Sequence, residues 1–549
     1  MFFAGVSGRI AREGSAMARA ASEVLFAFVI LISFAAYWVL LGGYFAHVYE
    51  PDTSFSLIDS YVTAITNFSI SALPEPHGKV PYFDADSILY AIFAVLLRMA
   101  GFWSAFSSKE SVYIFSVYAV NIAIYSVGVG VFYRLCYRLS GSLLWSGLLA
   151  MMFAISPQIL MINPLRIDYL IYPLIACVSY LCILMIQGGG SKSVGYSLGV
   201  VSAFLVATKV TGAAYLLLPF LSLALLFREK SFPFLLRGFL LSLIGMLVLL
   251  MARYLYHGAL FYSFISGIAE VRRWSDIIPM EPWFFYNIDN FSAYGIVFLV
   301  LAFAAIGFLS FYAFFKKDKL SIFVLAPLVF FSLLLMCSPK LPRWGIVISF
   351  YYFLAIAVAL SYAYGLLRKV GAGFRGANQA LPIMFALLLL PSAYVLLEQY
   401  RAVYEGARHK AAAMKSTKEM PARWFKANAD NDAVVCMIVH SDWSLPPLPG
   451  VELRAGPFNF PYLDPVLMGA FQPPELEDVS RECEYILIDQ FHRDAMLGAF
   501  AKYGHAGMKN AWEEFWETRI KSYYEHHRFT TEYPEWSGWN LDLYVRKPR

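Results

Sequence analysis

The stretch SILYAIFAVLLRMAGFW, from Ser87 to Trp103, is an almost unbroken apolar run that contains a single charged residue, Arg98. A helix needs roughly 20 mainly apolar residues to cross about 30 Å of hydrocarbon, so this run is short for a membrane span. If it crossed a membrane, every later loop of the chain would change sides. The interpretation of this one segment therefore decides the topology of the whole chain.

The rest of the chain is rich in further apolar runs. Of its 549 residues, 59% are hydrophobic and 15% are charged, and the mean hydropathy is +0.58. Soluble domains carry about 25% charged residues. We predict a polytopic α-helical membrane protein with about 11 transmembrane helices. The candidate spans are Ser22–Phe45, Val112–Phe132, Ser142–Leu160, Tyr169–Ile186, Val194–Ala207, Gly212–Phe227, Phe234–Tyr256, Phe291–Phe315, Ile322–Met336, Ile346–Leu367 and Ala380–Leu397.

The short loops between these runs carry many of the Lys and Arg residues, and such loops mark the cytoplasmic face. They fall on one side if Ser87–Trp103 is a helix along the outer membrane surface. We therefore expect a cytoplasmic N-terminus and an extracytoplasmic first loop, residues 46–111, with surface helices. The inner set is Arg9, Arg12, Arg19, Arg134, Arg138, Lys192, Arg228, Lys230, Arg237, Lys316, Lys317, Lys319, Arg368, Lys369 and Arg375.

The composition changes after residue 403, where Asp, Glu, Pro, Trp and His become frequent. We predict two domains, a membrane domain at residues 1–403 and an extracytoplasmic α/β domain at residues 404–549. In the second domain, Cys436 and Cys483 could form a disulfide or remain two buried thiols. The expected helices and strands there are Ala411–Ala427, Asp494–Tyr503 and Asn510–Tyr524, and Ala433–Val439, Tyr485–Asp489 and Leu541–Val545.

Acidic residues gather in the predicted first outer loop. Glu50 and Asp52 follow the first span directly, and Asp84 and Asp86 lead into the surface helix. A partly buried carboxylate there can act as general base towards a hydroxyl nucleophile. The alternative is that these acids cap helices. Asp84-Ala85-Asp86 also has a spacing that can hold a divalent metal such as Mg or Mn through oxygen ligands.

Four cations lie at predicted outer ends of the spans, against the tendency for basic residues to be inside. They suit a phosphate-bearing lipid, although snorkelling of each side chain to lipid phosphate is the alternative. Two other polar residues, Asp168 and His257, lie close to them in the sequence. The cations are Arg166, Lys209, Arg253 and Arg343.

The order of these elements resembles the GT-C membrane glycosyltransferases. It is similar to bacterial members related to the lipid A aminoarabinose transferase and the protein O-mannosyltransferases. Besides the acidic motif and the surface helix, the resemblance covers Ser156-Pro157, Arg166-Ile167-Asp168, Thr208-Lys209, the segment from Arg253 to Gly258, and Pro342-Arg343-Trp344.

The resemblance implies a polyprenyl-phosphate-linked sugar donor and a glycan, lipid or protein acceptor. It implies an inverting hexosyl- or pentosyltransferase at the outer face of a bacterial inner membrane, facing the periplasm and the cell envelope. Asp52 would be the base, and Lys209 and Arg343 would stabilise the leaving phosphate. Because Thr53 follows Asp52 where many relatives carry Asp-Glu, Asp84 or Asp86 can share or replace the role of Asp52.

Other functions remain compatible with the sequence. A transporter or flippase of lipid-linked saccharides would also need cations at the outer face, but paired repeats are expected there. A polymerase or ligase of envelope polysaccharide would use a similar donor, and a non-enzymatic scaffold would need none of the acids. Nucleic acid is not an expected partner, because the net charge of +5 is spread over short loops.

Overall fold

The computed structural model describes the chain in segments separated by gaps. The described residues are 16–41, 55–69, 71, 73, 84–106, 109–156, 168–189, 192–208, 210–261, 265, 294–336, 346–370, 377–413, 419–429, 433–438, 451–454, 472–502, 504–530 and 540–548. Contacts divide the chain into two compact units. The first, here the helical unit, extends along the chain to Ala407, and the second, the C-terminal unit, contains the described residues from Arg408 onwards.

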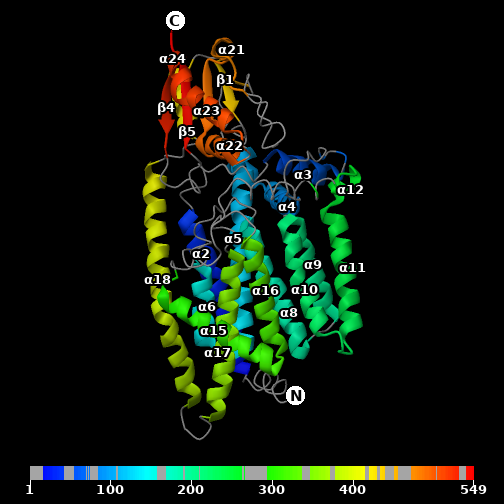
Figure 1. The fold of residues 1–549 in the computed structure, drawn as a ribbon. Coiled ribbons are helices and arrows are strands. Elements are labelled where there is room, and N and C mark those ends of the chain that lie inside the picture. Colours follow the sequence, from blue (N-terminus) through cyan, green and yellow to red (C-terminus); the bar gives the residue numbers. More distant parts are fainter. Residues whose placement is uncertain are drawn as a thin grey trace. The chain divides into compact units, whose positions relative to one another are not determined.

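The helical unit is a bundle of helices (Figure 1). Its elements are α2 (Ala16–Leu41), α3 (Phe55–Asn67), α4 (Ala85–Met99), η2 (Phe102–Ala105), α5 (Lys109–Ser140), α6 (Leu143–Ala154), α8 (Asp168–Leu184), η3 (Met185–Gly189), α9 (Lys192–Thr208), η4 (Val210–Leu216), α10 (Leu217–Leu225), α11 (Phe232–Leu250), α12 (Ala252–Tyr256), α15 (Ile296–Lys316), α16 (Lys319–Met336), α17 (Ile346–Val370) and α18 (Ala377–Ala413).

Within the described residues, each predicted span overlaps helix in this bundle, which confirms the polytopic helical fold. Among the described residues, six helices are long and apolar enough to cross a membrane: α2, α5, α8, α11, α15 and α17. Shorter apolar helices lie at Leu143–Ala154, Lys192–Thr208, Gly212–Leu225 and Lys319–Leu333. The count of eleven crossings therefore stays a prediction.

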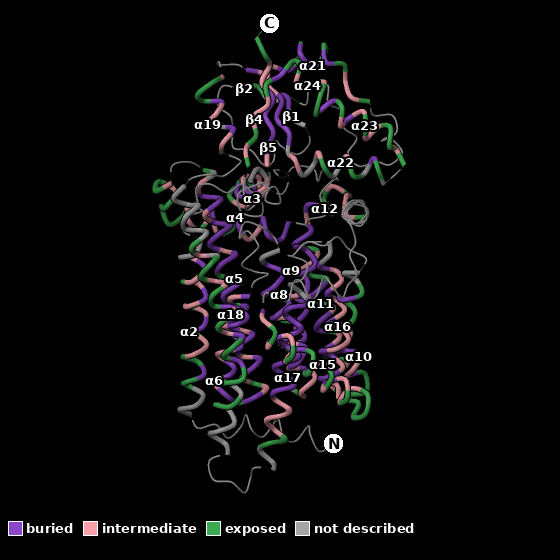
Figure 2. The backbone as a smooth tube through the Cα atoms, turned by 60° about the vertical axis from the view of Figure 1, so that its left-hand side comes forward, coloured by how far each residue is buried: buried purple, intermediate pink, exposed green. Residues whose placement is uncertain are grey.

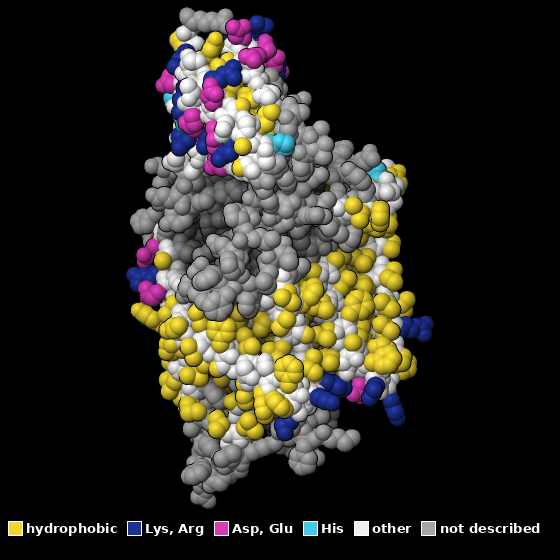
Figure 3. Space-filling model, viewed as in Figure 1, with side chains coloured by type: hydrophobic (Ala, Val, Ile, Leu, Met, Phe, Trp, Pro, Cys, Tyr) yellow, Lys and Arg dark blue, Asp and Glu magenta, His cyan; other side chains and the backbone are white. Residues whose placement is uncertain are grey.

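The surface of the bundle is apolar, as lipid contact requires. Large hydrophobic side chains such as Leu241, Ile244 and Val248 of α11 are exposed, and Figure 3 shows hydrophobic side chains covering this face of the helical unit. Water-soluble proteins rarely expose contiguous apolar patches of this kind. By contrast, α17 is buried on all sides from Ile348 to Val358, so it is a central helix of the bundle (Figure 2).

Helices α9 and α11 approach each other closely because α9 carries Gly195 and Gly199 four residues apart. A Cβ atom on Gly199 would lie 2.0 Å from the Oγ atom of Ser242 and 2.4 Å from the carbonyl oxygen of Phe239, both on α11. Small residues at this spacing let helix backbones pack tightly in membranes. The pair of glycines thus helps to determine where α11 lies.

The segment that decides the topology forms a short helix, as predicted. It is α4, which is not among the helices that could cross a membrane, and it packs against α3, α5 and α9. Helices α3, α4 and α12 lie at the same end of the bundle (Figures 1 and 2). Helix α3 was not predicted by its residue range, although Ile58, Tyr61 and Val62 form a buried stripe at helical spacing.

The described residues of the C-terminal unit form a mixed five-stranded sheet with helices, which confirms the predicted α/β architecture. The strand order is β2-β1-β3-β5-β4; β1 pairs in parallel with β2 and β3, and β5 pairs antiparallel with β3 and β4. The elements are α19 (Glu419–Asn428), β1 (Ala433–Ile438), β2 (Val451–Arg454), α21 (Leu476–Glu482), β3 (Tyr485–Asp489), α22 (Gln490–Lys502), α23 (Ala506–Glu514), η8 (Phe515–Arg519), α24 (Ile520–Tyr523), β4 (Tyr524–Phe529) and β5 (Leu541–Arg546).

Three of these strands were predicted and two were not. The predictions for β1, β3 and β5 are confirmed, whereas β2, β4 and α21 were missed. Strand β4 has the sequence YEHHRF, whose polar residues hide its strand character. The predicted domain boundary after residue 403 lies within α18, and Cys436 and Cys483 form a disulfide with their Cα atoms 5.5 Å apart.

Candidate functional site

Asp84 of the acidic motif lies at the entrance to α4, in the N-cap position. Its carbonyl oxygen accepts the first helical hydrogen bond, from the backbone N–H of Ile88 at 2.9 Å. The Asp84 side chain, however, makes no capping hydrogen bond to α4. The carboxylate is therefore available for contacts with other elements of the bundle, and helix capping does not account for it.

The carboxylate of Asp84 forms a buried ion pair with Arg253 of α12. The Nε atom of Arg253 lies 2.6 Å from Oδ2 of Asp84, and its Nη2 atom donates a hydrogen bond of 3.2 Å to Oδ1. The two side chains are only 3% and 8% exposed. One hydrogen bond and one close ion-pair contact therefore join the guanidinium to the two oxygens of this carboxylate.

Two phenolic hydroxyls complete the surroundings of this carboxylate. Tyr61 of α3 donates a hydrogen bond of 2.6 Å to Oδ2, and Tyr254 of α12 donates a longer one of 3.4 Å to Oδ1. Nη2 of Arg253 also donates to the Tyr254 oxygen at 3.3 Å. We call Tyr61, Asp84, Arg253 and Tyr254 the Asp84 cluster. It joins α3, α4 and α12.

Burial and charge act in opposite directions on this cluster. Burial raises the pKa of Asp84 above its ordinary value, and the Arg253 charge and the hydroxyl donors oppose that shift. Burial alone would lower the pKa of Arg253, but the Asp84 carboxylate, together with the hydroxyls of Tyr254 and Tyr61, outweighs it and the pKa is raised. Burial, followed by the Asp84 charge, raises the pKa of Tyr61, so its hydroxyl remains a neutral donor.

Asp86 is buried at the start of α4, next to this cluster. Burial and then the charge of Asp86 raise the pKa of Tyr90, whose hydroxyl donates a 2.9 Å hydrogen bond to Oδ1 of Asn121. Among the described residues, no three His, Cys, Asp or Glu side chains gather as metal ligands do. Both oxygens of Asp84 contact Arg253, and the Asp-x-Asp metal site stays a prediction.

His257 ends α12 at the C-cap. Its ring lies edge-on to Tyr256, with the ring centroids 5.0 Å apart, and its Nε2 atom is buried without a hydrogen-bond partner among the described residues. The structure therefore places His257 on the same short element as Arg253, four residues apart.

The remaining predicted site residues are not described. The side chain of Asp168, at the start of α8, lies outside the described residues, as do Glu50, Asp52, Arg166, Lys209 and Arg343. Arg253 is thus the predicted phosphate-binding cation whose position is known, and it contacts Asp84. Tyr61 and Tyr254 were missed because their contacts to Asp84 span 23 and 170 residues of sequence, a separation that no local motif reveals.

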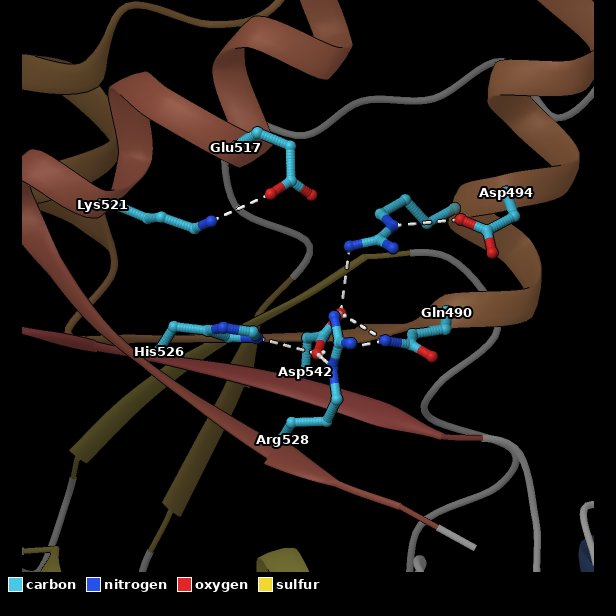
Figure 4. Close-up of polar contacts among 8 residues, drawn as sticks. Gln490, Asp494, Glu517, Lys521, His526, Arg528 and Asp542 are labelled. Carbon is cyan, nitrogen blue, oxygen red and sulfur yellow. Dashed lines mark hydrogen bonds and ion pairs between the residues drawn. The ribbon is translucent and has the colours of Figure 1, made fainter. Parts of the chain in front are cut away.

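A second buried carboxylate, Asp542 on β5, lies in the C-terminal unit (Figure 4). Its oxygens contact Arg528 Nε at 2.8 Å, His526 Nε2 at 2.8 Å, Arg493 Nη1 at 3.1 Å and Gln490 Nε2 at 3.2 Å. We call these five residues the Asp542 cluster. Although burial opposes ionisation, hydrogen bonds led by Arg528 outweigh it and lower the pKa of Asp542.

Neighbouring pairs balance the charge of the Asp542 cluster. Arg493 also pairs with Asp494, whose Oδ1 lies 3.2 Å from its Nε, and Lys521 pairs with Glu517 at 2.9 Å (Figure 4). The two arginines and the lysine thus face three carboxylates. This arrangement leaves no surplus charge for a ligand, so we interpret it as a structural ion cluster.

The sequence matches no family model and no curated protein. Among solved structures, the chain is similar to ArnT from Cupriavidus metallidurans bound to undecaprenyl phosphate, with 12% identity, a TM-score of 0.51, and coverage of 96% of this chain and 99% of that chain. The apo state of that protein matches with a TM-score of 0.52 and 12% identity over 96% of this chain and 100% of that chain.

The chain is also similar to the archaeal oligosaccharyltransferase AglB from Archaeoglobus fulgidus, in complex with an inhibitory peptide and a dolichol-phosphate. The identity is 12%, the TM-score is 0.52, and the match covers 95% of this chain and 74% of that chain. Identity at this level is evidence of a shared fold, while function depends on the site. Both matches extend over the helical and the C-terminal units, as the predicted architecture requires.

Proposed function

Since this chain has the GT-C fold of membrane glycosyltransferases, we propose that it transfers a sugar from a polyprenyl-phosphate-linked donor to an envelope glycan, lipid or protein. The observation that carries the proposal is the match over 96% of this chain and 99% of ArnT, a protein whose structure holds undecaprenyl phosphate. A match of this extent supports a shared fold over both units of the chain.

The proposed transfer is one inverting displacement. An acceptor hydroxyl oxygen attacks the anomeric carbon, and the bond from that carbon to the phosphate oxygen breaks as the new one forms. The electrons of the broken bond leave with the polyprenyl phosphate. The hydroxyl proton passes to a carboxylate, for which Asp52 is our candidate. Because the phosphate leaves as a stable anion, no general acid is needed.

The cations of the predicted outer ends have a role in this scheme. Negative charge grows on the leaving phosphate in the transition state, and fixed cations there lower the barrier. We assign Lys209, Arg343 and Arg166 to this role. They are drawn from three separate parts of the sequence, as expected for a site built between helices of a bundle.

The transfer is proposed to occur at the outer face of a bacterial inner membrane. The basic residues of the short loops favour a cytoplasmic N-terminus. The disulfide between Cys436 and Cys483 favours an oxidising compartment for the C-terminal unit, because disulfides persist outside the reducing cytosol. The donor would then be taken from the outer leaflet.

The test compares envelope glycans from a deletion strain complemented with wild type, Asp52→Asn or Asp478→Asn at matched membrane levels. Asp478 is an exposed residue of α21 and serves as the control. We expect wild type and Asp478→Asn to restore a sugar that Asp52→Asn does not, because Asn keeps the shape of Asp but cannot accept the proton. If the deletion strain lacked no sugar, the proposed function would be contradicted. If Asp52→Asn restored the missing sugar fully, the assignment of Asp52 as the base would be contradicted.

A further inference from the structure

The acidic motif Asp84-Ala85-Asp86 requires a counter-charge, because two adjacent buried carboxylates are costly without one. A divalent metal would be one solution and a side-chain cation another. In the structure, the guanidinium of Arg253 lies against Asp84 through two of its nitrogens, at 2.6 Å and 3.2 Å. The position that a metal would take on this carboxylate is therefore filled by the protein itself.

We propose that Arg253 is the built-in cation of this acidic motif, and that Asp84, Arg253 and Tyr61 position the first loop for the transfer reaction without a metal ion on Asp84. The inference rests on the proposed function. In this assignment Asp84 and Arg253 are positioning residues. The base and the phosphate-binding cations are then other residues.

We call the contacts of Arg253 and Tyr61 with Asp84 the joint. The joint matters because of the chain segments that it connects. Tyr61 lies on α3, which begins three residues after Asp52, and Asp84 begins α4. Arg253 follows α11 directly, so its position is that of a packed helix of the bundle. The Asp84 cluster thus connects α3 and α4 of the first loop to one end of α11. In the sequence, Asp52 precedes the first residue of α3 by three positions.

The burial of the cluster makes the joint specific. At 3% and 8% exposure, the two charges are screened little by water or salt. Removing one partner leaves the other buried and uncompensated, which displaces the elements that carry them. Since a misplacement of about 1 Å can cost about 100-fold in rate, the joint acts on turnover through geometry.

The first experiment measures sugar transfer by the full chain in proteoliposomes, with the donor that the glycan comparison identifies. The variants are Arg253→Ala, Arg253→Lys, Asp84→Asn and Tyr61→Phe. Arg134→Gln is the control, because Arg134 forms an exposed ion pair with Glu23 outside the Asp84 cluster. Each protein is measured with and without EDTA, and Arg253→Ala also with guanidinium at concentrations that do not unfold the control.

We expect kcat to fall about 100-fold in Arg253→Ala, with the donor KM little changed, because a positioning residue acts on the geometry of the site rather than on donor binding. Guanidinium should restore part of the loss, and Arg253→Lys should keep more activity than Arg253→Ala although it lacks the paired geometry. EDTA should leave the wild-type rate unchanged. The proposal would be overturned if Arg253→Ala turned over at the wild-type rate. It would also be overturned if neither the Arg253→Lys substitution nor added guanidinium reduced the loss, or if EDTA abolished the activity of the wild-type protein.

A second measurement separates this inference from the proposed function. Hydrogen exchange of residues 55–67 and 85–99 reports on α3 and α4 whether or not transfer is observed. We expect faster exchange there in Arg253→Ala, and slower exchange again when guanidinium is added. If exchange in these residues were unchanged in Arg253→Ala, the inference that Arg253 positions α3 and α4 would be overturned. A wild-type protein that transfers no sugar but shows this exchange pattern would overturn only the proposed function.

Discussion

The two buried carboxylates of this protein, Asp84 in the helical unit and Asp542 in the C-terminal unit, have opposite electrostatic outcomes. Their side chains are 3% and 0% exposed, so both lose nearly all contact with water. Burial prevails at Asp84 and its pKa is raised, whereas at Asp542 the hydrogen bonds prevail and the pKa is lowered. The difference lies in the partners. Asp84 has one arginine and two hydroxyls, and Asp542 has two arginines, a histidine and an amide.

Burial alone therefore does not determine what a carboxylate does. A carboxylate with several cationic partners is a stable ionised centre that holds elements of a fold together. One with a single cation is close to the balance between burial and charge, so a small change in its surroundings has a large effect. We therefore expect mutations at Asp542 to act on stability and mutations at Asp84 to act mainly on turnover.

The largest expected effect on stability is at Asp542. Asp542→Ala should lower the free energy of unfolding of the C-terminal unit by about 3–5 kcal/mol, because two arginines and a histidine lose their buried partner. The measurement is denaturant unfolding of the full chain in detergent, followed by hydrogen exchange of β4 and β5. Asp494→Ala is the control: Asp494 is 66% exposed, and its loss should cost less than about 1 kcal/mol. If Asp542→Ala and Asp494→Ala lowered the free energy of unfolding equally, the buried carboxylate would have no special role in stability.

The disulfide stabilises the C-terminal unit, as the Asp542 cluster does, but by restricting the unfolded chain. Cys436 and Cys483 are 47 residues apart, and a closed loop of this length restricts the unfolded chain by about 4 kcal/mol in the chain-entropy model. The double substitution Cys436→Ser and Cys483→Ser should destabilise the C-terminal unit and leave exchange in α9 and α11 unchanged. Destabilisation of both units together would show that they unfold cooperatively.

A smaller effect is expected where α9 meets α11. Gly199→Ala places a Cβ atom 2.0 Å from Ser242 Oγ and should cost about 1–3 kcal/mol by forcing α11 away. Because Arg253 follows α11, exchange in α4 should also rise. The matched control is Gly245→Ala on α11, where a Cβ atom would meet nothing within 4 Å. A thermal shift of equal size in both variants would contradict this explanation.

The smallest effect is the dependence of stability on pH, which should have opposite signs at the two carboxylates. Because the pKa of Asp542 is lowered in the folded state, its ionisation stabilises the fold at pH values above about 3.9, the pKa expected in the unfolded chain. This stabilisation is lost as the pH falls through the folded pKa. The raised pKa of Asp84 means that the folded state holds the proton more tightly, so stability falls as the pH rises through the folded pKa.

Melting temperatures of wild type, Asp84→Asn and Asp542→Asn at several pH values test this sign. The deficit of Asp542→Asn should shrink as the pH falls below about 4. The melting temperature of Asp84→Asn should improve relative to wild type as the pH rises. Parallel pH profiles for the two variants would contradict the opposite shifts.

The helices were easier to predict than the site. Within the described residues every predicted span overlaps helix, and most of the segment from Ser87 to Trp103 lies in the short helix α4 (Ala85–Met99). Strands β1, β3 and β5 were predictable from their apolar runs, whereas the polar β4 was not. The acidic motif and Arg253 were singled out as separate candidates, but nothing in either segment indicated that they form a pair across 169 residues.

The sequence by itself determined the helical membrane fold, because a span must satisfy its backbone hydrogen bonds internally and bury an apolar length that can be read locally. It also determined that acids and cations occur near predicted span ends. Only the tertiary structure decided which of these groups meet: Arg253 reaches Asp84 because α11 is brought close to α9 and α4 packs beside it. Whether a carboxylate faces a guanidinium, a metal or water depends on long-range packing, since its charge can be balanced by any cation that the fold brings within reach.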